Sequence, residues 1–317
     1  MGNFKLLQKS INEKLMQGDF VCLIGPNGCG KSTLIRTLSG MQSPLNGRIY
    51  INEKEIRQLT NAERSRLLSI VLTDNTVVGN ITVAEIVALG RYSYTNWIGT
   101  LELKDKQILS ESLNKVGLKG FESRRLNTLS DGEKQRTFIA KGLASDAPVM
   151  LLDEPTAHLD IPNKVGIMTL LRHLTRLAKH SVLVATHELD LALKLADEVW
   201  LMLPDQTIYK GTPEELIFSG NLDRVFGNEL LRFDPHSGNF AFNTKPTGSI
   251  IVEGKKKNLD ITLQAVNRIG FTTNNLNDNK AVRIIVSNNH WIIDMSGNKV
   301  EFQSLAETCR FLRNINE

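Results

Sequence analysis

The first residues that could do chemistry lie in a glycine-rich stretch at 25–32, with the sequence GPNGCGKS. It matches the pattern G-x-x-x-x-G-K-[ST], in which the glycines let the backbone curl until successive N–H groups face phosphate oxygens. In this pattern Lys31 brings a full positive charge to the β- and γ-phosphates of a nucleotide, and Ser32 offers a hydroxyl to Mg²⁺. The stretch lies between an apolar run at 20–24 and a helical pattern at 32–39, which is the required context. The sequence therefore predicts a phosphate-binding loop.

A buried-strand pattern at 149–152 ends in two acidic residues, Asp153 and Glu154. A carboxylate at the end of such a strand can hold Mg²⁺, directly or through water. The carboxylate after it can orient or deprotonate an attacking water. Two acids after a strand are otherwise typical of a solvated strand end, so it is their combination with the phosphate loop that predicts nucleotide hydrolysis.

Apolar runs separated by helical patterns predict the sheet that must position these residues. Strands that alternate with helices favour an α/β domain with a mostly parallel sheet and right-handed crossovers. This predicted domain spans residues 1–225. Between about residues 77 and 144 buried strands are lacking, and helical spacing predicts a helical insertion within the domain. The predicted strands are 20–24, 149–152, 181–185 and 198–203, and the predicted helices are 32–39, 83–89, 104–116, 132–143, 164–178 and 189–195.

After about residue 226 the chain becomes rich in Asn and Gly, and short alternating runs replace the buried ones. Residues 226–317 are therefore predicted to form a small α+β domain. It contains no catalytic constellation, so a regulatory role and a passive or dimer-stabilising role both remain open. The predicted elements are strands at 248–253, 281–287 and 290–294, helices at 261–268 and 304–312, and a solvated turn around the lysines at 255–257.

Composition limits the class of protein. The 317 residues are 41% hydrophobic and 23% charged, which is ordinary for a globular protein, and the formal charge of +4 is too small to indicate nucleic-acid binding. No apolar run approaches the roughly 20 residues needed to span a bilayer, and no secretory signal is evident. The three cysteines, Cys22, Cys29 and Cys309, lack metal-ligand spacing. We therefore expect a protein of a reducing compartment, cytoplasmic or bound to a membrane through partners.

Over about residues 6–216 the chain resembles the nucleotide-binding subunit of ABC transporters. The resemblance rests on an ordered set of motifs, which is more specific than the phosphate loop alone. Residues 25–33 resemble Walker A, 129–135 (LSDGEKQ) the ABC signature, 151–156 (LLDEPT) Walker B, 157–160 the D-loop, and His187 the switch histidine. The implied fold is a P-loop NTPase-type α/β sheet, mostly parallel, with a helical ABC subdomain.

The resemblance also implies the ligands and the active unit. ATP and Mg²⁺ are expected, with two copies of the chain arranged head to tail so that they sandwich two ATP molecules. The implied catalytic residues are Lys31, Glu154 and His187, and the implied metal site is Ser32, Asp153 and Thr73. The implied nucleotide-binding residues are Gly25, Pro26, Asn27, Gly28, Cys29, Gly30, Lys31, Ser32 and Thr33, with Ser130, Gly132 and Asp160 acting across the dimer.

Three departures from the family pattern bear on this expectation. Thr73 stands where the family carries a glutamine before the helical insertion. Thr73 or Asp74 could substitute for it, with a shorter reach to Mg²⁺ or water. Asp131 and Glu133 add negative charge to the signature, which is unfavourable near a phosphate unless the carboxylates point away. The family's first strand and adenine-stacking aromatic residue have little counterpart, with Phe4 a weak substitute, so that Met1 could be a mis-assigned start.

Residues 79–92 (GNITVAEIVALGRY) resemble importer ATPases that serve iron–siderophore, haem and cobalamin uptake. The implied partners are an integral membrane permease and, indirectly, a periplasmic or extracellular substrate-binding protein, at the cytoplasmic face of the plasma membrane. The main alternative is a soluble ABC ATPase that acts on nucleic acid or ribosomes, which the single cassette, the lack of heptads and the balanced charge disfavour. An exporter usually has fused membrane helices, and a non-enzymatic module would not need Lys31, Asp153 and Glu154.

Overall fold

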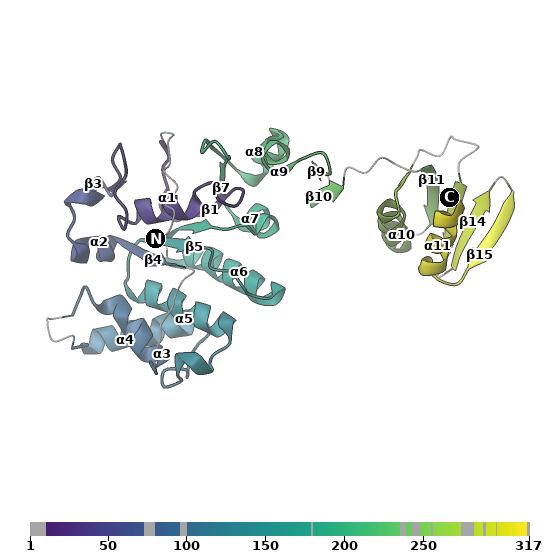
Figure 1. Cartoon of the computed structure of the whole chain (residues 1–317). Helices are drawn as coiled ribbons and strands as arrows, with labels where there is room; N and C mark the ends of the chain where they lie inside the picture. The colour runs from purple at the N-terminus through teal and green to yellow at the C-terminus, as the bar shows by residue number, and fades with distance from the viewer. Residues whose placement is uncertain are drawn as a thin grey trace. The chain divides into compact units, whose positions relative to one another are not determined.

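The computed structural model forms two compact units, residues 1–241 and 242–317 (Figure 1). It describes residues 11–72, 80–95, 100–178, 180–234, 239–242, 248–254, 256–273, 282–287, 290–295 and 297–315. Among these residues, no helix combines the length and the apolar character that crossing a bilayer requires.

The first unit is built on a six-stranded sheet with the order β4-β5-β6-β1-β7-β8. Its first five strands are parallel, and β8 pairs antiparallel with β7 at one edge. This confirms the predicted α/β class with a mostly parallel sheet. The strands are β4 (Leu68–Val71), β5 (Val149–Asp153), β6 (Ser181–Ala185), β1 (Phe20–Ile24), β7 (Glu198–Met202) and β8 (Ile208–Gly211).

Two hydrophobic cores cover the two faces of this sheet. Successive side chains of a strand point to opposite faces, so Phe20 and Cys22 pack in one core while Val21 and Leu23 pack in the other. Burial on both faces explains why the strands are continuous apolar runs. The first core also contains residues of α5 (Asp131–Ala144), α6 (Ile161–Ala178) and α7 (Leu189–Leu195), and the second contains residues of α1 (Lys31–Leu38).

The predicted helical insertion consists of α3 (Val83–Ala88), α4 (Leu103–Lys115) and α5. Thr82 and Ser130 begin α3 and α5 with capping boxes, in which a glutamate three residues later bonds back to the cap. The sequence did not single out the remaining short elements of this unit. They are β2 (Tyr50–Ile51), β3 (Lys54–Glu55), α2 (Asn61–Leu67), α8 (Pro213–Phe218), α9 (Asn221–Phe226), β9 (Leu231–Asp234) and β10 (Asn239–Phe242).

The two compact units divide later than the boundary at 225/226 that the change in composition suggested. The rings of Phe233 and Phe240 lie 5.2 Å apart, and Phe240 is 6.0 Å from Phe226. All three pack in or against the core that includes α6. Phe226, Phe233 and Phe240 therefore belong to the first unit, because their side chains complete its core.

The second unit is a five-stranded sheet with the order β12-β11-β13-β14-β15. Strands β12, β11 and β13 are parallel, and β14 and β15 are antiparallel additions. Helix α10 begins at Lys256, earlier than predicted, so Lys256 and Lys257 are helical and not part of a turn. The elements are β11 (Gly248–Gly254), α10 (Lys256–Arg268), β12 (Phe271–Thr273), β13 (Val282–Ser287), β14 (His290–Met295), β15 (Asn298–Phe302) and α11 (Leu305–Ile315).

We predict that Leu312→Ala destabilises the second unit, because Leu312 is 1% exposed and packs with Ile284 and Ile293. The lost burial and the resulting cavity should cost about 2–5 kcal/mol. Hydrogen exchange of the β13 and β14 amides would measure this cost. Ile315→Ala on the same helix is the matched control, since Ile315 is 42% exposed. Equal protection in the two variants would contradict the assigned core.

Candidate functional site

The phosphate loop, the acidic pair and His187 follow three neighbouring parallel strands. Strands β5, β6 and β1 are adjacent in the sheet, so the loops after their carboxyl ends start from the same edge. The phosphate loop follows β1, Asp153 and Glu154 lie at the end of β5, and His187 follows β6. The sheet therefore brings residues that are far apart in the sequence together at the carboxyl ends of its parallel strands.

The phosphate loop is closely packed at both ends. A Cβ atom on Gly25 would lie 2.3 Å from the carbonyl oxygen of Met202, so only glycine fits where the loop leaves β1. Lys31 is 6% exposed, and its ammonium donates hydrogen bonds to the carbonyl oxygens of Gly25 (2.8 Å) and Pro26 (3.2 Å). The charge of Lys31 is thus fixed inside the curl of the loop, where a phosphate group would meet it.

The other predicted loop residues divide between the tip and the base. Asn27 and Gly28 are exposed at the tip, whereas Cys29 is 2% exposed and packs with Leu34 of α1. Cys29 is therefore part of the core beneath the loop. Thr33 is partly buried in the first turn of α1.

Ser32 and Asp153, two of the three residues predicted to hold Mg²⁺, are in direct contact. The Ser32 hydroxyl donates a hydrogen bond of 2.9 Å to the Asp153 carboxylate, so an alcohol oxygen and a carboxylate oxygen are adjacent. Burial raises the pKa of Asp153, the bond from Ser32 opposes this rise, and the charge of Glu154 adds to it. These hard oxygen donors fit Mg²⁺, whose positive charge would favour the ionised carboxylate. Thr73, the third predicted ligand, lies outside the described residues.

Glu154 and His187 face each other across the ends of β5 and β6. The Nδ1 atom of His187 lies 3.6 Å from Oε2 of Glu154. Glu154 has a left-handed backbone (φ 46°), and its N–H donates to the carbonyl oxygen of Ala185 (2.8 Å). Both side chains are accessible, with 29% of Glu154 and 46% of His187 exposed. The geometry suits a carboxylate and an imidazole that act on the same group.

The signature helix α5 begins with a complete capping box. The Ser130 N–H donates to the Glu133 carboxylate (2.8 Å), and the Glu133 N–H donates to the Ser130 hydroxyl (3.3 Å). The bond from the Ser130 N–H lowers the pKa of Glu133, burial opposes this, and Arg124 contributes at 3.5 Å. Asp131 pairs with Lys134 at 2.9 Å. Both unusual acids are therefore compensated within the helix or beside it.

Gly132 and Asp160 lie where the signature helix approaches α6. A Cβ atom on Gly132 would lie 2.7 Å from the side-chain oxygen of Asn163, so glycine allows the close approach. Asp160 begins α6 by accepting a hydrogen bond from the Asn163 N–H at 3.0 Å. Ser130 and Asp160 are both exposed.

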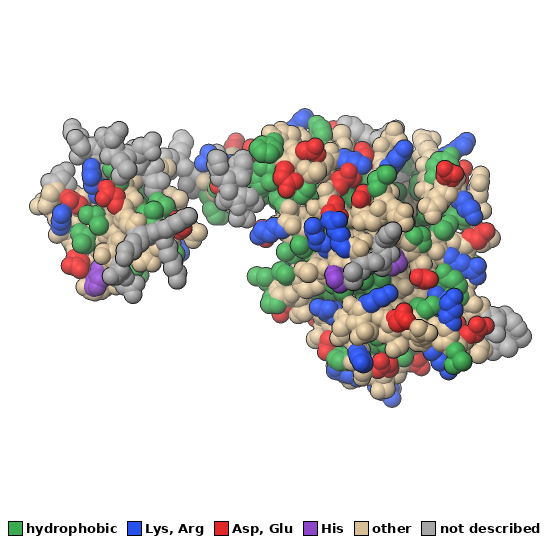
Figure 2. All heavy atoms as spheres, turned by 180° about the vertical axis from the view of Figure 1, so that it is seen from behind, with side chains coloured by type: hydrophobic (Ala, Val, Ile, Leu, Met, Phe, Trp, Pro, Cys, Tyr) green, Lys and Arg blue, Asp and Glu red, His purple; other side chains and the backbone are tan. Residues whose placement is uncertain are grey.

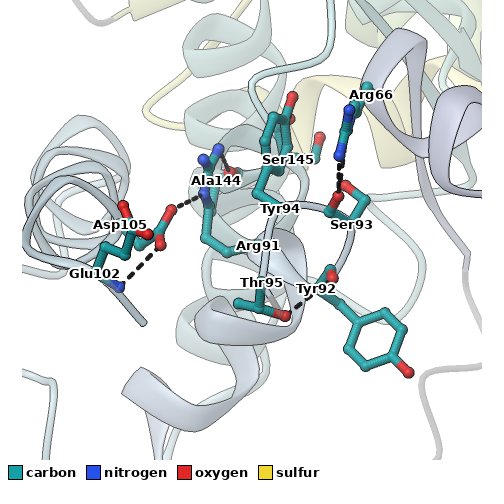
Figure 3. Close-up of polar contacts among 10 residues, drawn as sticks. All are labelled: Arg66, Arg91, Tyr92, Ser93, Tyr94, Thr95, Glu102, Asp105, Ala144 and Ser145. Carbon is teal, nitrogen blue, oxygen red and sulfur yellow. Dashed lines mark hydrogen bonds and ion pairs between the residues drawn. The ribbon is translucent and has the colours of Figure 1, made fainter. Parts of the chain in front are cut away.

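A buried ion pair anchors the Gly-Arg-Tyr segment of the helical insertion (Figure 3). The Arg91 guanidinium donates to the Asp105 carboxylate (2.8 Å) and to the carbonyl oxygen of Ala144 (3.1 Å), and the Arg91 and Asp105 side chains are only 4% and 8% exposed. Burial acts to raise the pKa of Asp105, but hydrogen bonds from Arg91 and the Glu102 N–H outweigh it, so the pKa is lowered. The pair joins α4 to the end of α5.

Tyr94 extends this anchor to α2. Its ring stacks against the Arg91 guanidinium at 3.8 Å, and its hydroxyl donates to the Ser145 carbonyl (3.1 Å). On the other side Arg66 lies 5.0 Å from the ring centre and donates to the Ser93 carbonyl (2.6 Å). The contacts therefore connect α2, which precedes β4, with the helical insertion.

The sequence did not single out two residues near His187. Glu188 contacts the His187 ring, and Lys164 pairs with Glu188. Each residue lies near a predicted site residue in the sequence. Lys164 follows Asp160 by one helical turn, and Glu188 is adjacent to His187. The sequence does not show that Lys164 and Glu188 contact each other, because the two residues are distant in it.

A helical insertion that ends in a capped signature helix distinguishes this sheet among phosphate-loop proteins, and it defines an ATP-binding cassette. A family profile described as ABC transporter matches residues 8–157. The ferric enterobactin transport ATP-binding protein FepC of Escherichia coli is 30% identical over 226 residues, which are 71% of this chain and 83% of that protein. The petrobactin import ATP-binding protein FpuD of Bacillus anthracis is 33% identical over 230 residues, 72% of this chain and 84% of that protein.

A solved structure extends the similarity to three dimensions. The ATP-binding cassette MJ0796, a dimer in a post-hydrolysis state bound to ADP and Pi, is 26% identical, with a TM-score of 0.58 over 67% of this chain and 94% of that chain. The chain belongs to the ABC transporter family, and it is an ABC-type ATPase that binds ATP. The predicted family and the predicted cassette fold are thereby confirmed.

We predict that Lys31→Ala weakens ATP binding at least about tenfold, because a buried charge-assisted contact to phosphate contributes ~1.5–3 kcal/mol. Titration with a fluorescent ATP analogue would measure the affinity. Lys194→Ala is the control, since Lys194 is exposed and pairs only with Asp190 among the described ion pairs. Unchanged affinity in Lys31→Ala would remove Lys31 from the phosphate site.

We predict that Asp105→Ala destabilises the first unit by about 3–5 kcal/mol, because it leaves the Arg91 charge buried without its carboxylate. Denaturant unfolding would measure the loss. Asp190→Ala removes an exposed partner of Lys194 and should cost less than about 1 kcal/mol. A small loss in both variants would show that the Arg91 pair does not anchor the insertion.

Proposed function

We propose that the chain is the ATP-hydrolysing subunit of an importer of metal chelates, of the iron–siderophore, haem or cobalamin class. The observation that carries the ATPase part is the convergence of Lys31, the Ser32–Asp153 pair and the Glu154–His187 pair on one edge of the sheet. The substrate class is supported by the printed functions of FepC and FpuD and by the segment at 79–92.

The side chains have complementary roles in hydrolysis. Lys31, the loop N–H groups and the N-terminus of α1 bind the phosphates of ATP. Ser32 and Asp153 would hold Mg²⁺, which when bound neutralises charge on the β- and γ-phosphate oxygens. Glu154 orients the attacking water and accepts its proton. His187 donates a hydrogen bond to the γ-phosphate and keeps the water in line with it.

A second copy of the chain completes each site in this proposal. Ser130 and Gly132 present the N-terminus of α5, and Asp160 presents the start of α6, to ATP held by the partner's phosphate loop. The pairing of Asp131 with Lys134 and of Glu133 with Arg124 supports this role, since both acids have nearby positive charge. The dimeric state of MJ0796 supports the same arrangement.

Closure of this dimer on ATP would move an integral membrane permease, and hydrolysis would reset it. The chain would then lie at the cytoplasmic face of the plasma membrane, with an external binding protein delivering the cargo to the permease.

The alternative function is a soluble ABC ATPase that acts on nucleic acid or ribosomes. A continuous stripe of basic side chains on the surface would support it. In the view of Figure 2, Lys and Arg side chains are interspersed with Asp and Glu. That mixture supports a protein partner over a polyanion.

We predict that Glu154→Gln binds ATP but lowers kcat by about 10²–10⁴-fold, because the amide cannot accept the proton of the attacking water. The ATP-closed dimer should then persist. Affinity purification of this variant from detergent-solubilised membranes with ATP, followed by mass spectrometry, should recover a permease with many membrane helices.

Lys31→Ala/Glu154→Gln is the control, since it should not hold the ATP needed for closure. Recovery of ribosomes or nucleic acid without a membrane protein would overturn the importer while leaving the ATPase intact. Brisk hydrolysis by Glu154→Gln would instead remove Glu154 from the chemistry.

A further inference from the structure

One carboxylate oxygen beside the site lies close to both a lysine ammonium and a histidine ring nitrogen. Oε1 of Glu188 lies 2.6 Å from Nζ of Lys164 and 3.3 Å from Nε2 of His187. The other ring nitrogen of His187 faces Glu154 at 3.6 Å. His187 therefore lies between two carboxylates, and only Glu188 has a lysine beside it among the described ion pairs.

Both ends of the Lys164–Glu188 contact are held by local hydrogen bonds. The Lys164 N–H donates to the Asp160 carbonyl (2.9 Å) in the first turn of α6, so Lys164 is one turn from the predicted dimer contact. The Glu188 N–H donates to the hydroxyl of Thr186 (3.0 Å), which is fully buried at the end of β6. The ion pair thus connects the start of α6 with the His187 loop.

The electrostatic effect of this pair depends on its partial burial. The Lys164 and Glu188 side chains are 24% and 19% exposed, so water screens their charges less than at a free surface. Without Lys164, the negative charge of Glu188 would attract the His187 imidazole more strongly. The same charge would also repel a γ-phosphate next to His187. Each effect opposes the contact between His187 and the phosphate.

We propose that Lys164 is a positioning residue for ATP hydrolysis. By neutralising Glu188 it leaves His187 available to the γ-phosphate, and it ties the His187 loop to the turn that begins at Asp160. This inference rests on the proposed function, because it requires His187 to contact the γ-phosphate. It adds two residues, Lys164 and Glu188, that act through His187 and do not touch the substrate.

Steady-state ATPase kinetics of the full chain test the inference with a charge cycle. Lys164→Met keeps the aliphatic stem and should lower kcat about tenfold, which corresponds to ~1.4 kcal/mol in the barrier. It should change ADP affinity little, because ADP has no γ-phosphate. In Lys164→Met/Glu188→Gln the uncompensated charge is gone, so kcat should recover most of the loss. A charged arginine at the same position, Lys164→Arg, should also retain most of the activity.

Two controls separate positioning from a merely structural effect. Lys194→Met removes an exposed lysine from α7 and should leave kcat unchanged. In the His187→Ala background, Lys164→Met should cause no further loss, since the residue on which it acts is absent.

Three outcomes would overturn the inference. The first is wild-type kcat in Lys164→Met, the second is a double variant as impaired as Lys164→Met, and the third is a further loss in the His187→Ala background. A wild-type chain without ATPase activity would overturn the proposed function as well. If the wild-type chain is active and any of these three outcomes is observed, only the positioning role of Lys164 is overturned.

Discussion

The parallel pairing of β1 with β6, and of β6 with β5, is the constraint on which the rest of the site depends. Because of this pairing, the loops that follow the carboxyl ends of the three strands begin on the same side of the sheet. Because β1 is buried on both faces, a shift of one residue in register would exchange the side chains of its two cores. The spacing between the phosphate loop, the acidic pair and His187 is therefore set by a fully buried sheet and not by the loops themselves.

A second constraint is electrostatic, since a site for a polyanion tolerates carboxylates only where their charge is compensated or used. Asp153 accepts a hydrogen bond from Ser32, Glu133 bonds back to the start of its own helix, and Glu188 pairs with Lys164. Glu154 differs from these acids because its partner among the described ion pairs is His187, and it is the acid proposed as the base. The acidic departures from the family signature therefore do not conflict with phosphate binding.

Contiguous features were predictable from the sequence, and contacts between distant segments were not. The runs at 20–24 and 181–185 coincide with β1 and β6, because strands buried on both faces leave an unbroken apolar pattern. The half-exposed edge strand β8 and the lysine-rich first turn of α10 leave no such pattern and were missed. The Arg91–Asp105 and Lys164–Glu188 pairs join segments whose proximity only the tertiary fold creates.

The backbone at Glu154 shows how these constraints combine. A left-handed conformation at a non-glycine residue costs on the order of 1–3 kcal/mol and persists only where the surroundings fix it. Here the hydrogen bond from the Glu154 N–H to Ala185 fixes it against β6, the strand that leads to His187. The base and the histidine are thus held by the same strand, while Lys164 links that strand's loop to the turn after Asp160. In the proposed dimer, a displacement at the Asp160 contact would therefore reach both side chains through one ion pair and one strand, which would couple closure to the alignment of the proposed hydrolytic groups.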